Sequence, residues 1–274
     1  MTYDAGDGAR PGVLRDGQIA DVNAPSLRSL LAAGGLEQVE TGAGVPLAEA
    51  RLLPPIPDPS KLICIGLNYR SHAAEAGLEP PSAPTFFAKF ANALVPDGTT
   101  VPLPAYSEKV DYEAEVAFVI GSRAKDVPEE RALEHIAGYT LLNDLSARDY
   151  QFMTPQWMPG KVFDRSAPCG PALVTPDEAG APDAIEIELR LNGEVMQSAS
   201  TEDLIYSIPA LVAHLSKLMT LEPGDIVSTG TPAGVGSLRQ PRVWLGPGDE
   251  IEINSPTLGT LRTFVAEPVL GSEQ

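Results

Sequence analysis

The chain has little of what disulfide-rich, zinc-binding and membrane proteins are built from. It contains two cysteines and three histidines in 274 residues, and Cys64 and Cys169 stand in neither a metal-ligand nor a redox spacing. We therefore expect both thiols to be free and buried. The longest apolar runs, such as residues 116–120, fall far short of the roughly 20 residues that a membrane-spanning helix needs. The polar, glycine-rich start does not resemble a secretory signal, so a cytoplasmic location is predicted.

Positive charge is also scarce. The sequence has 19 lysines and arginines against 37 aspartates and glutamates, so the formal net charge is −18. A field of this sign repels phosphate backbones and anionic membrane surfaces. Nucleic acid and membranes are therefore excluded as main partners.

Proline and glycine, in contrast, are abundant, with 27 and 25 residues. They favour many short strands and turns over long helices, and the length fits one large domain with a small appendage. The proline-rich run 53–59 cannot form a regular helix or a central strand. We place a domain boundary there, which predicts a small N-terminal domain over residues 1–58 and a main domain over residues 59–274.

The positions of the turn residues and of the apolar residues also predict individual elements. The pattern indicates a hairpin over residues 12–24, a helix over 26–33, a long strand over 110–120, a hairpin over 186–197 and a helix over 208–219. Residues 129–136 are also interpreted as helical.

An acidic stretch occupies the start of the predicted strand 110–120. Side chains alternate between the two faces of a strand, so Asp111, Glu113 and Glu115 share a face that becomes apolar farther along. The other face is entirely apolar, which predicts a strand that is buried on both sides. Like charges at such a place raise each other's pKa unless a cation neutralises them. A divalent metal explains the pattern, and an edge strand with its acidic face in water is the alternative.

A further carboxylate, Asp144, follows the apolar run 139–142. With Glu113 and Glu115 it makes a donor set of oxygen atoms only, which suits Mg²⁺ or Mn²⁺ and leaves positions for water and substrate. A helix cap is the alternative interpretation of Asp144.

Two other patterns are candidates for catalysis and binding. His72 and Glu75 are three residues apart, so a helical turn places them on one face, where the carboxylate can orient the imidazole as a base. A structural histidine is the alternative. Lys161 can act as a point charge on a substrate carboxylate or an oxyanion, and the glycine-rich turn that contains Gly230 and Thr231 can present backbone N–H groups to an anion.

Together these stretches resemble the fumarylacetoacetate hydrolase family, from about residue 52 to the C-terminus. The motifs that carry the resemblance are Gly-x-Asn-Tyr-x-x-His-x-x-Glu over 66–75, Asp-x-Glu-x-Glu over 111–115, Asn-Asp-x-Ser-Ala-Arg-Asp over 143–149, Gly-Lys-x-x-Asp over 160–164 and Thr-Gly-Thr-Pro-x-Gly-Val-Gly over 229–236. The resemblance implies an α+β, β-rich fold, namely a mixed β-sandwich roll with a small N-terminal domain, and a homodimer.

The resemblance also implies roles for individual residues. It makes the three carboxylates the ligands of one Mg²⁺ or Mn²⁺ ion, and it makes the histidine and its glutamate a water-activating pair on a segment that can close as a lid. By residue, it implies the metal ligands Glu113, Glu115 and Asp144, the catalytic residues His72, Glu75 and Lys161, and the substrate-binding or site-bordering residues Arg148, Gln151, Gly230 and Thr231. The connection 151–157 differs among relatives, so the part of the site for the distal end of the substrate stays open.

The expected function is hydrolysis of a carbon–carbon bond in an acylpyruvate-like or 2,4-diketo acid, which gives pyruvate or a related 2-oxo acid and a carboxylic acid. Two alternatives within enzymes are decarboxylation of a 2-oxo diacid such as oxaloacetate and isomerisation of a 2-hydroxyhepta-2,4-diene-1,7-dioate. An alternative of another class is a metal-stabilised binding protein without catalysis.

Overall fold

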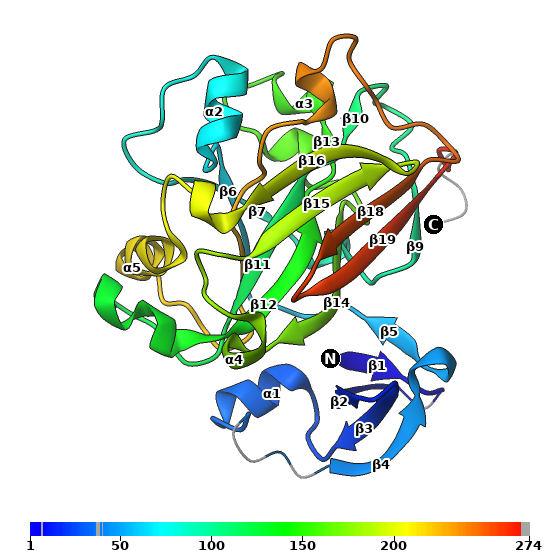
Figure 1. Ribbon diagram of the computed structural model, residues 1–274, viewed down its shortest axis with the longest axis vertical. Coiled ribbons are helices and arrows are strands. Elements are labelled where there is room, and N and C mark those ends of the chain that lie inside the picture. The colour runs from blue at the N-terminus through cyan, green and yellow to red at the C-terminus, as the bar shows by residue number, and fades with distance from the viewer. Residues whose placement is uncertain (7, 37–38, 40, 270–274) are drawn as a thin grey trace.

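The molecule is β-rich, with a small lobe packed against one end of a larger body (Figure 1). The computed structural model describes residues 1–6, 8–36, 39 and 41–269. The α+β, β-rich class expected from the resemblance is confirmed. Cys64 and Cys169 are both free and buried, as predicted. Within the described residues, no helix is long and apolar enough to cross a membrane.

The small lobe is a five-stranded sheet in the order β4-β3-β2-β1-β5. The predicted hairpin is confirmed, because β2 pairs with β3 around Asp16 and Gly17, whose φ values of 48° and 74° suit a type I′ turn. The elements of the lobe are β1 (Thr2–Asp4), β2 (Ala9–Arg15), β3 (Gln18–Val22), α1 (Leu27–Ala32), β4 (Thr41–Pro46), the 3₁₀ turn η1 (Leu47–Glu49) and β5 (Arg51–Leu53).

The lobe and the body share a hydrophobic cluster. Leu27 and Leu31 of α1 pack in one cluster with Ile56 of the proline-rich segment and with Ala117 and Val119 of the body. The proline-rich segment thus separates two sheets and also joins their cores, and the domain division at residue 58 stays a prediction.

The body contains two large sheets and one small one. A seven-stranded sheet has the order β7-β6-β17-β11-β12-β14-β8, a five-stranded sheet has the order β16-β15-β18-β19-β9, and β10 pairs with β13. Its strands are β6 (Leu62–Gly66), β7 (Thr85–Lys89), β8 (Leu94–Val95), β9 (Thr99–Pro102), β10 (Val110–Asp111), β11 (Ala114–Ile120), β12 (Ile136–Asn143), β13 (Ser146–Ala147), β14 (Ala167–Val174), β15 (Glu186–Leu191), β16 (Glu194–Ser200), β17 (Ile226–Ser228), β18 (Glu250–Ser255) and β19 (Gly259–Ala266).

Helices in the body are few and short. The α-helices are α2 (Arg70–Ala76), α3 (Arg148–Gln151), α4 (Pro176–Ala179) and α5 (Ile208–Leu218), and the 3₁₀ turns are η2 (Ala91–Ala93), η3 (Glu129–His135), η4 (Met158–Gly160), η5 (Thr201–Asp203) and η6 (Gly236–Leu238). The predicted helix at α5 and the predicted hairpin of β15 and β16 are both confirmed. The residues interpreted as helical over 129–136 form the 3₁₀ helix η3 up to His135, and Ile136 already begins β12. Figure 1 shows α2 and α3 at the end of the body that is farthest from the small lobe.

The central strand β11 is buried on both faces, as its sequence predicts. Val116 and Phe118 belong to the core between the two large sheets, whereas Ala117 and Val119 belong to the cluster shared with the small lobe. The single strand predicted over residues 110–120 was wrong in one respect. It divides into β10 and β11 because the buried Asp111 carboxylate accepts the next backbone N–H, from Tyr112, at 2.9 Å, and the chain then changes its partner from β13 to β12.

Candidate active site

Three buried carboxylates meet where β11 begins and β12 ends. Glu113 and Glu115 are two residues apart and therefore share a face, and Asp144 follows on the adjacent strand, with its N–H donating to the Glu113 carbonyl at 3.0 Å. One carboxylate oxygen from each residue lies within 4.8 Å of the others. We call Glu113, Glu115 and Asp144 the acidic triad. The register of β11 and β12 thus brings together three residues that the sequence separates.

The members of the acidic triad have different charge environments. Burial alone would raise the pKa of Glu113, but the neighbouring Lys161 and Arg148 lower the pKa to about 2. Burial and the nearby carboxylates Asp144 and Glu113 raise the pKa of Glu115 well above its ordinary value. Glu115 accepts hydrogen bonds from the Ser228 hydroxyl and from the Gly230 N–H, and no cation among the described residues contacts it. Glu115 is therefore the member of the triad whose charge no described side chain neutralises by direct contact.

Two buried lysines contact the triad. Lys161 Nζ lies 2.8 Å from both Glu113 Oε2 and Asp144 Oδ2, and Lys89 Nζ lies 2.7 Å from Asp144 Oδ1. Burial acts against the charge of Lys161, but the carboxylates of Asp144 and Glu113 outweigh it and raise the pKa of Lys161. Sequence reasoning missed Lys89. A signal was available in the sequence, because Lys89 lies two residues after Phe87 and therefore on the same, buried face of β7. A lysine is seldom fully buried without a partner, so this position indicates a nearby carboxylate.

A tight turn places Lys161. The turn η4 ends at Gly160, where a Cβ atom would lie 2.4 Å from the carbonyl oxygen of Ala147, so this position requires glycine. The Lys161 N–H then donates to Met158, and the Ser166 hydroxyl donates to the Lys161 carbonyl at 3.0 Å. The ammonium is thus carried on a backbone that is bound at several points.

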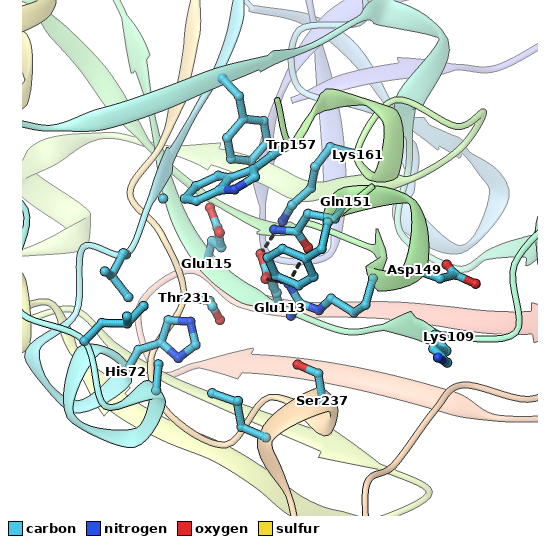
Figure 2. A pocket seen from close by; sticks show the side chains of 18 of the residues that line it. His72, Lys109, Glu113, Glu115, Asp149, Gln151, Trp157, Lys161, Thr231 and Ser237 are labelled. Carbon is cyan, nitrogen blue, oxygen red and sulfur yellow. Dashed lines mark hydrogen bonds and ion pairs between the residues drawn. The ribbon is translucent and has the colours of Figure 1, made fainter. Parts of the chain in front are cut away.

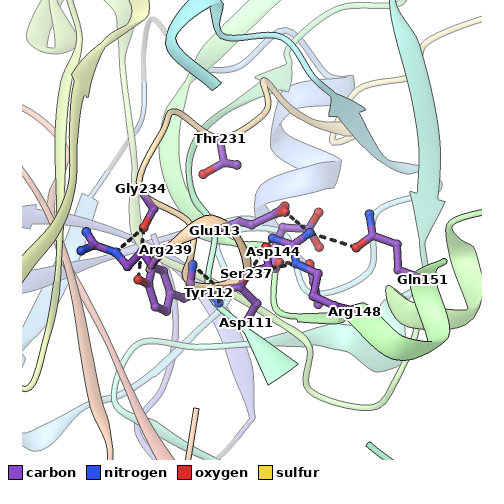
Figure 3. Close-up of polar contacts among 12 residues, drawn as sticks. Asp111, Tyr112, Glu113, Asp144, Arg148, Gln151, Thr231, Gly234, Ser237 and Arg239 are labelled. Atoms are coloured by element: carbon purple, nitrogen blue, oxygen red, sulfur yellow. Dashed lines mark hydrogen bonds and ion pairs between the residues drawn. The ribbon is translucent and has the colours of Figure 1, made fainter. Parts of the chain in front are cut away.

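Arg148 and Asp111 form the second polar layer of the site (Figure 3). The Arg148 guanidinium contacts Asp111 at 2.8 Å and Glu113 at 2.7 Å, and it donates to Gln151 Oε1 at 2.9 Å. Asp111 also accepts the backbone N–H groups of Gly236 and Ser237, at 2.8 and 3.0 Å. Asp111 thereby fixes both Arg148 and the chain segment around η6.

The glycine-rich turn after β17 closes another side. Thr231 donates to the Ala114 carbonyl at 2.9 Å and accepts from the side chain of Gln197 at 2.8 Å. Gly230 has φ of 95°, and a Cβ atom there would lie 2.9 Å from the carbonyl oxygen of Ile65. Its N–H points to Glu115, so the backbone donor expected from this turn is used inside the protein.

The helix α2 carries His72 and Glu75. His72 Nδ1 lies 3.4 Å from Glu75 Oε2, and the same carboxylate accepts the Gly234 N–H at 3.0 Å. The buried side chain of Asn68, just before α2, makes three hydrogen bonds, two with the backbone of Tyr206 and one with the carbonyl of residue 229. The predicted pairing of His72 with Glu75 on one helical turn is what the structure contains.

All these elements surround a cavity of about 550 Å³ (Figure 2). Several of the predicted site residues line it, namely His72, Glu113, Glu115, Arg148, Gln151, Lys161 and Thr231. Asp144, Glu75 and Gly230 are not among the described residues that line it. Phe87 and Trp157 supply an apolar wall, with their rings edge to face at a centroid distance of 6.0 Å.

The donor set fits a divalent cation. It consists of carboxylate oxygens, which hard cations such as Mg²⁺ and Mn²⁺ prefer. It is buried, its atoms are close enough for one ion, and Glu115 has no cationic partner among the described residues. Glu113, Glu115 and Asp144 could therefore hold such an ion.

Comparison with known proteins agrees with this geometry. Residues 61–266 match the family described as "Fumarylacetoacetate (FAA) hydrolase C-terminal". This chain belongs to that family. The matched range contains the acidic triad, both buried lysines and α2.

Its similarity to relatives extends over most of the chain. It is 44% identical over 212 residues to "Oxaloacetate tautomerase fahd2, mitochondrial" of Xenopus laevis, a match that covers 77% of this chain and 66% of that protein. The solved structure of a 5-carboxymethyl-2-hydroxymuconate delta-isomerase from Mycobacterium smegmatis is 36% identical, with a TM-score of 0.82 and 98% of each chain covered. That of a 2-hydroxyhepta-2,4-diene-1,7-dioate isomerase from Mycobacterium marinum is 34% identical, with a TM-score of 0.83 and 97% of each chain covered.

Proposed function

We propose that this member of the family is a metal-dependent enzyme that moves a proton at the carbon next to the keto group of a 2-oxo acid, as in keto–enol tautomerisation of an oxaloacetate-type diacid. The observation that carries the proposal is that His72 faces the same cavity as Lys161, Glu113 and Glu115 (Figure 2). A base and a cationic site on one cavity suit removal of a proton next to a carbonyl. The similarity to a tautomerase and two isomerases supports proton transfer over bond hydrolysis.

The acidic triad would hold one divalent cation, which supplies a Lewis acid for the keto and carboxylate oxygens of a bound 2-oxo acid. His72 would then take the proton from C3, with Nδ1 donating to Glu75 and Nε2 free to act as the base. The electron pair of the broken C–H bond forms the C2–C3 double bond, and negative charge develops on the C2 oxygen. A proton from water bonds to that oxygen to complete the enol, His72 returns its proton to water, and the reverse sequence restores the ketone.

Lys161 would stabilise the developing charge. Two of its N–H donors contact Glu113 and Asp144, so one remains to donate to an oxygen in the cavity. Its raised pKa keeps the ammonium charged, and burial strengthens a charge-assisted hydrogen bond. Arg148, bound by Asp111 and Glu113, contributes positive potential, and Gln151 holds it in place.

Hydrolysis of an acylpyruvate-like acid is the second candidate, and the size of the cavity favours it. About 550 Å³ with apolar lining from Leu78, Phe152 and Trp157 leaves room for an acyl group and for a water molecule beside His72. In that reaction His72 activates the water, the water oxygen bonds to the distal carbonyl, and the carbon–carbon bond breaks with its electrons forming an enolate. The enolate then takes a proton at C3.

A side-by-side assay separates the candidates. Oxaloacetate and acetylpyruvate would be incubated in D₂O with Mg²⁺ or Mn²⁺, and NMR would follow deuterium at C3, pyruvate, CO₂ and acetate. We expect deuterium exchange into oxaloacetate to exceed product release. Acetate from acetylpyruvate at a comparable rate would favour the hydrolase, CO₂ release as fast as exchange would favour the decarboxylase, and exchange no faster than without protein would refute the proposal. EDTA is the control for the cation.

We further propose a homodimer as the working assembly, and the cytoplasmic location stays a prediction. The Xenopus laevis relative is described as mitochondrial, and that location is a property of the relative.

A further inference from the structure

The far side of the cavity carries cations that the reaction proposed above does not use. Lys109 and Arg242 both line the cavity, and both side chains are exposed. Within the described part of the chain, neither side chain has a hydrogen bond or an ion pair, and neither does the hydroxyl of Ser237, which lies in the same wall. Figure 2 shows Lys109 across the cavity from His72, with Glu113 and Ser237 between them.

The backbone brings these residues together. The Leu245 N–H donates to the carbonyl of Val110, the residue after Lys109, at 2.9 Å, and the Val243 N–H donates to Gly236 at 3.0 Å. The segments that carry Lys109 and Arg242 are therefore hydrogen-bonded neighbours. Lys109 is also joined to the inner site, because its carbonyl accepts the Arg148 N–H at 2.9 Å.

The charges around the acidic triad, which we call the inner site, are almost balanced without Lys109 and Arg242. Three cations meet four carboxylates there, namely Lys89, Arg148 and Lys161 against Asp111, Glu113, Glu115 and Asp144. With all four carboxylates ionised around a divalent ion, these charges sum to one positive charge, which matches one carboxylate of a substrate. A second carboxylate would find no free counter-charge in the inner site.

We propose that Lys109, Arg242 and Ser237 form a second anion subsite, which binds the distal carboxylate of a 2-oxo dicarboxylic acid. The inference rests on the proposed function, since it assigns the other end of the same substrate. Carboxylates outnumber lysines and arginines in this protein, whose net charge is −18. Lys109 and Arg242 nevertheless line the cavity without pairing with a described carboxylate. Because Lys109 and Arg242 lie on two hydrogen-bonded segments, their N–H groups can donate to both oxygens of one carboxylate.

The test compares matched ligands that differ in one carboxylate. The pairs are 2-oxoglutarate with 2-oxopentanoate and oxaloacetate with 2-oxobutanoate, each titrated by calorimetry in the presence of Mn²⁺. Selectivity is the ratio of the two dissociation constants within a pair. We expect the wild type to prefer the dicarboxylate in at least one pair, and Lys109→Gln/Arg242→Gln to reduce that selectivity about tenfold. Affinity for the monocarboxylates should change less than twofold.

A matched control separates local contacts from overall charge. Lys217→Gln/Arg15→Gln removes the same charge from exposed side chains that do not line this cavity, and its selectivity should equal that of the wild type. The subsite is refuted if the wild type shows no preference, if the Lys109/Arg242 variant retains it, or if the control loses it equally.

Deuterium exchange at C3 keeps the two proposals distinguishable. If wild-type protein exchanges neither oxaloacetate nor 2-oxobutanoate but binds with the expected selectivity, the proposed function fails and the subsite stands. If exchange is present and the Lys109/Arg242 variant retains full selectivity, the function stands and the subsite fails.

Discussion

Replacement of Glu115 by glutamine tests the proposed metal site most directly, because it removes a carboxylate from the acidic triad and keeps the shape of the side chain. Wild-type protein at a cation concentration of 100 times its dissociation constant should gain about 2.7 kcal/mol of stability by mass action. Even the loss of an outer-shell partner costs roughly 10- to 100-fold in metal affinity, so the loss of one of three carboxylate ligands should cost at least about 100-fold. At the same concentration the variant would then gain only about 0.4 kcal/mol.

Thermal unfolding with and without Mn²⁺ measures this difference. For a chain of this size 1 kcal/mol corresponds to about 2–4 °C, so the wild-type Tm should rise by about 5–10 °C and that of Glu115→Gln by about 1 °C. Calorimetric titration gives the affinities, and Glu250→Gln, which removes one exposed carboxylate, is the control. A Mn²⁺ affinity of the variant within a few-fold of wild type would remove Glu115 from the ligand set.

The same variant should have the opposite effect without metal. Because the pKa of Glu115 is raised in the folded protein, its contribution to stability is fully present below the ordinary carboxyl pKa of 4.5 and is lost as the pH rises through the raised pKa. Glutamine has no proton to lose there. Metal-free Glu115→Gln should therefore gain stability relative to metal-free wild type as the pH rises above 4.5, and urea titrations at several pH values would measure this gain. A difference that stays constant with pH would contradict this account of the triad.

Three further substitutions test other parts of the site. His72→Ala should slow C3 exchange by roughly 10²–10⁴ and leave the Mn²⁺-induced Tm shift intact, and equal loss of both would exclude its role as the base. Asn68→Ala removes three hydrogen bonds of a buried side chain and should lower the free energy of unfolding by about 2–4 kcal/mol in urea titrations, whereas a loss below about 1 kcal/mol would refute that role. Gly66→Ala places a Cβ atom 2.1 Å from Trp157 Cζ3, so the indole must move. In a Trp244→Phe background the emission of Trp157 should therefore shift, and Mn²⁺-dependent binding of 2-oxopentanoate should weaken. Unchanged emission would show that the ring does not rest on Gly66.

The acidic triad shows what sequence periodicity can and cannot predict. Glu113 and Glu115 share a face because the period of a strand is two, and that follows from the sequence alone. Asp144 joins them only through the pairing of β11 with β12, in which Glu115 opposes Leu142. No local pattern specifies such a register between strands, so only the chemistry of the residues and the resemblance pointed to Asp144 as a third candidate ligand.

Lys89 and Asp111 mark the limit of that reasoning. Lys89 lies on β7, at the edge of the seven-stranded sheet, yet it contacts Asp144, which follows β12, although β6, β17 and β11 lie between β7 and β12 in the sheet order. Asp111 appeared to continue the acidic face of one strand, but its carboxylate accepts three backbone N–H groups and contacts Arg148, which ends the strand there. Contacts of this kind depend on tertiary structure that periodicity does not contain.

The net charge of the protein and the charged groups that line the cavity affect different kinds of ligand. At physiological ionic strength, exposed charges are screened beyond about 8 Å. A nucleic acid must approach many parts of a surface with a net charge of −18, so it meets the repulsion everywhere along its length. A small dianion inside the cavity interacts mainly with the groups that line it, and buried pairs are screened much less. The excess of acidic residues therefore opposes the binding of extended polyanions, whereas Lys161, Arg148, Lys109 and Arg242 offer positive charge to a small dianion in the cavity.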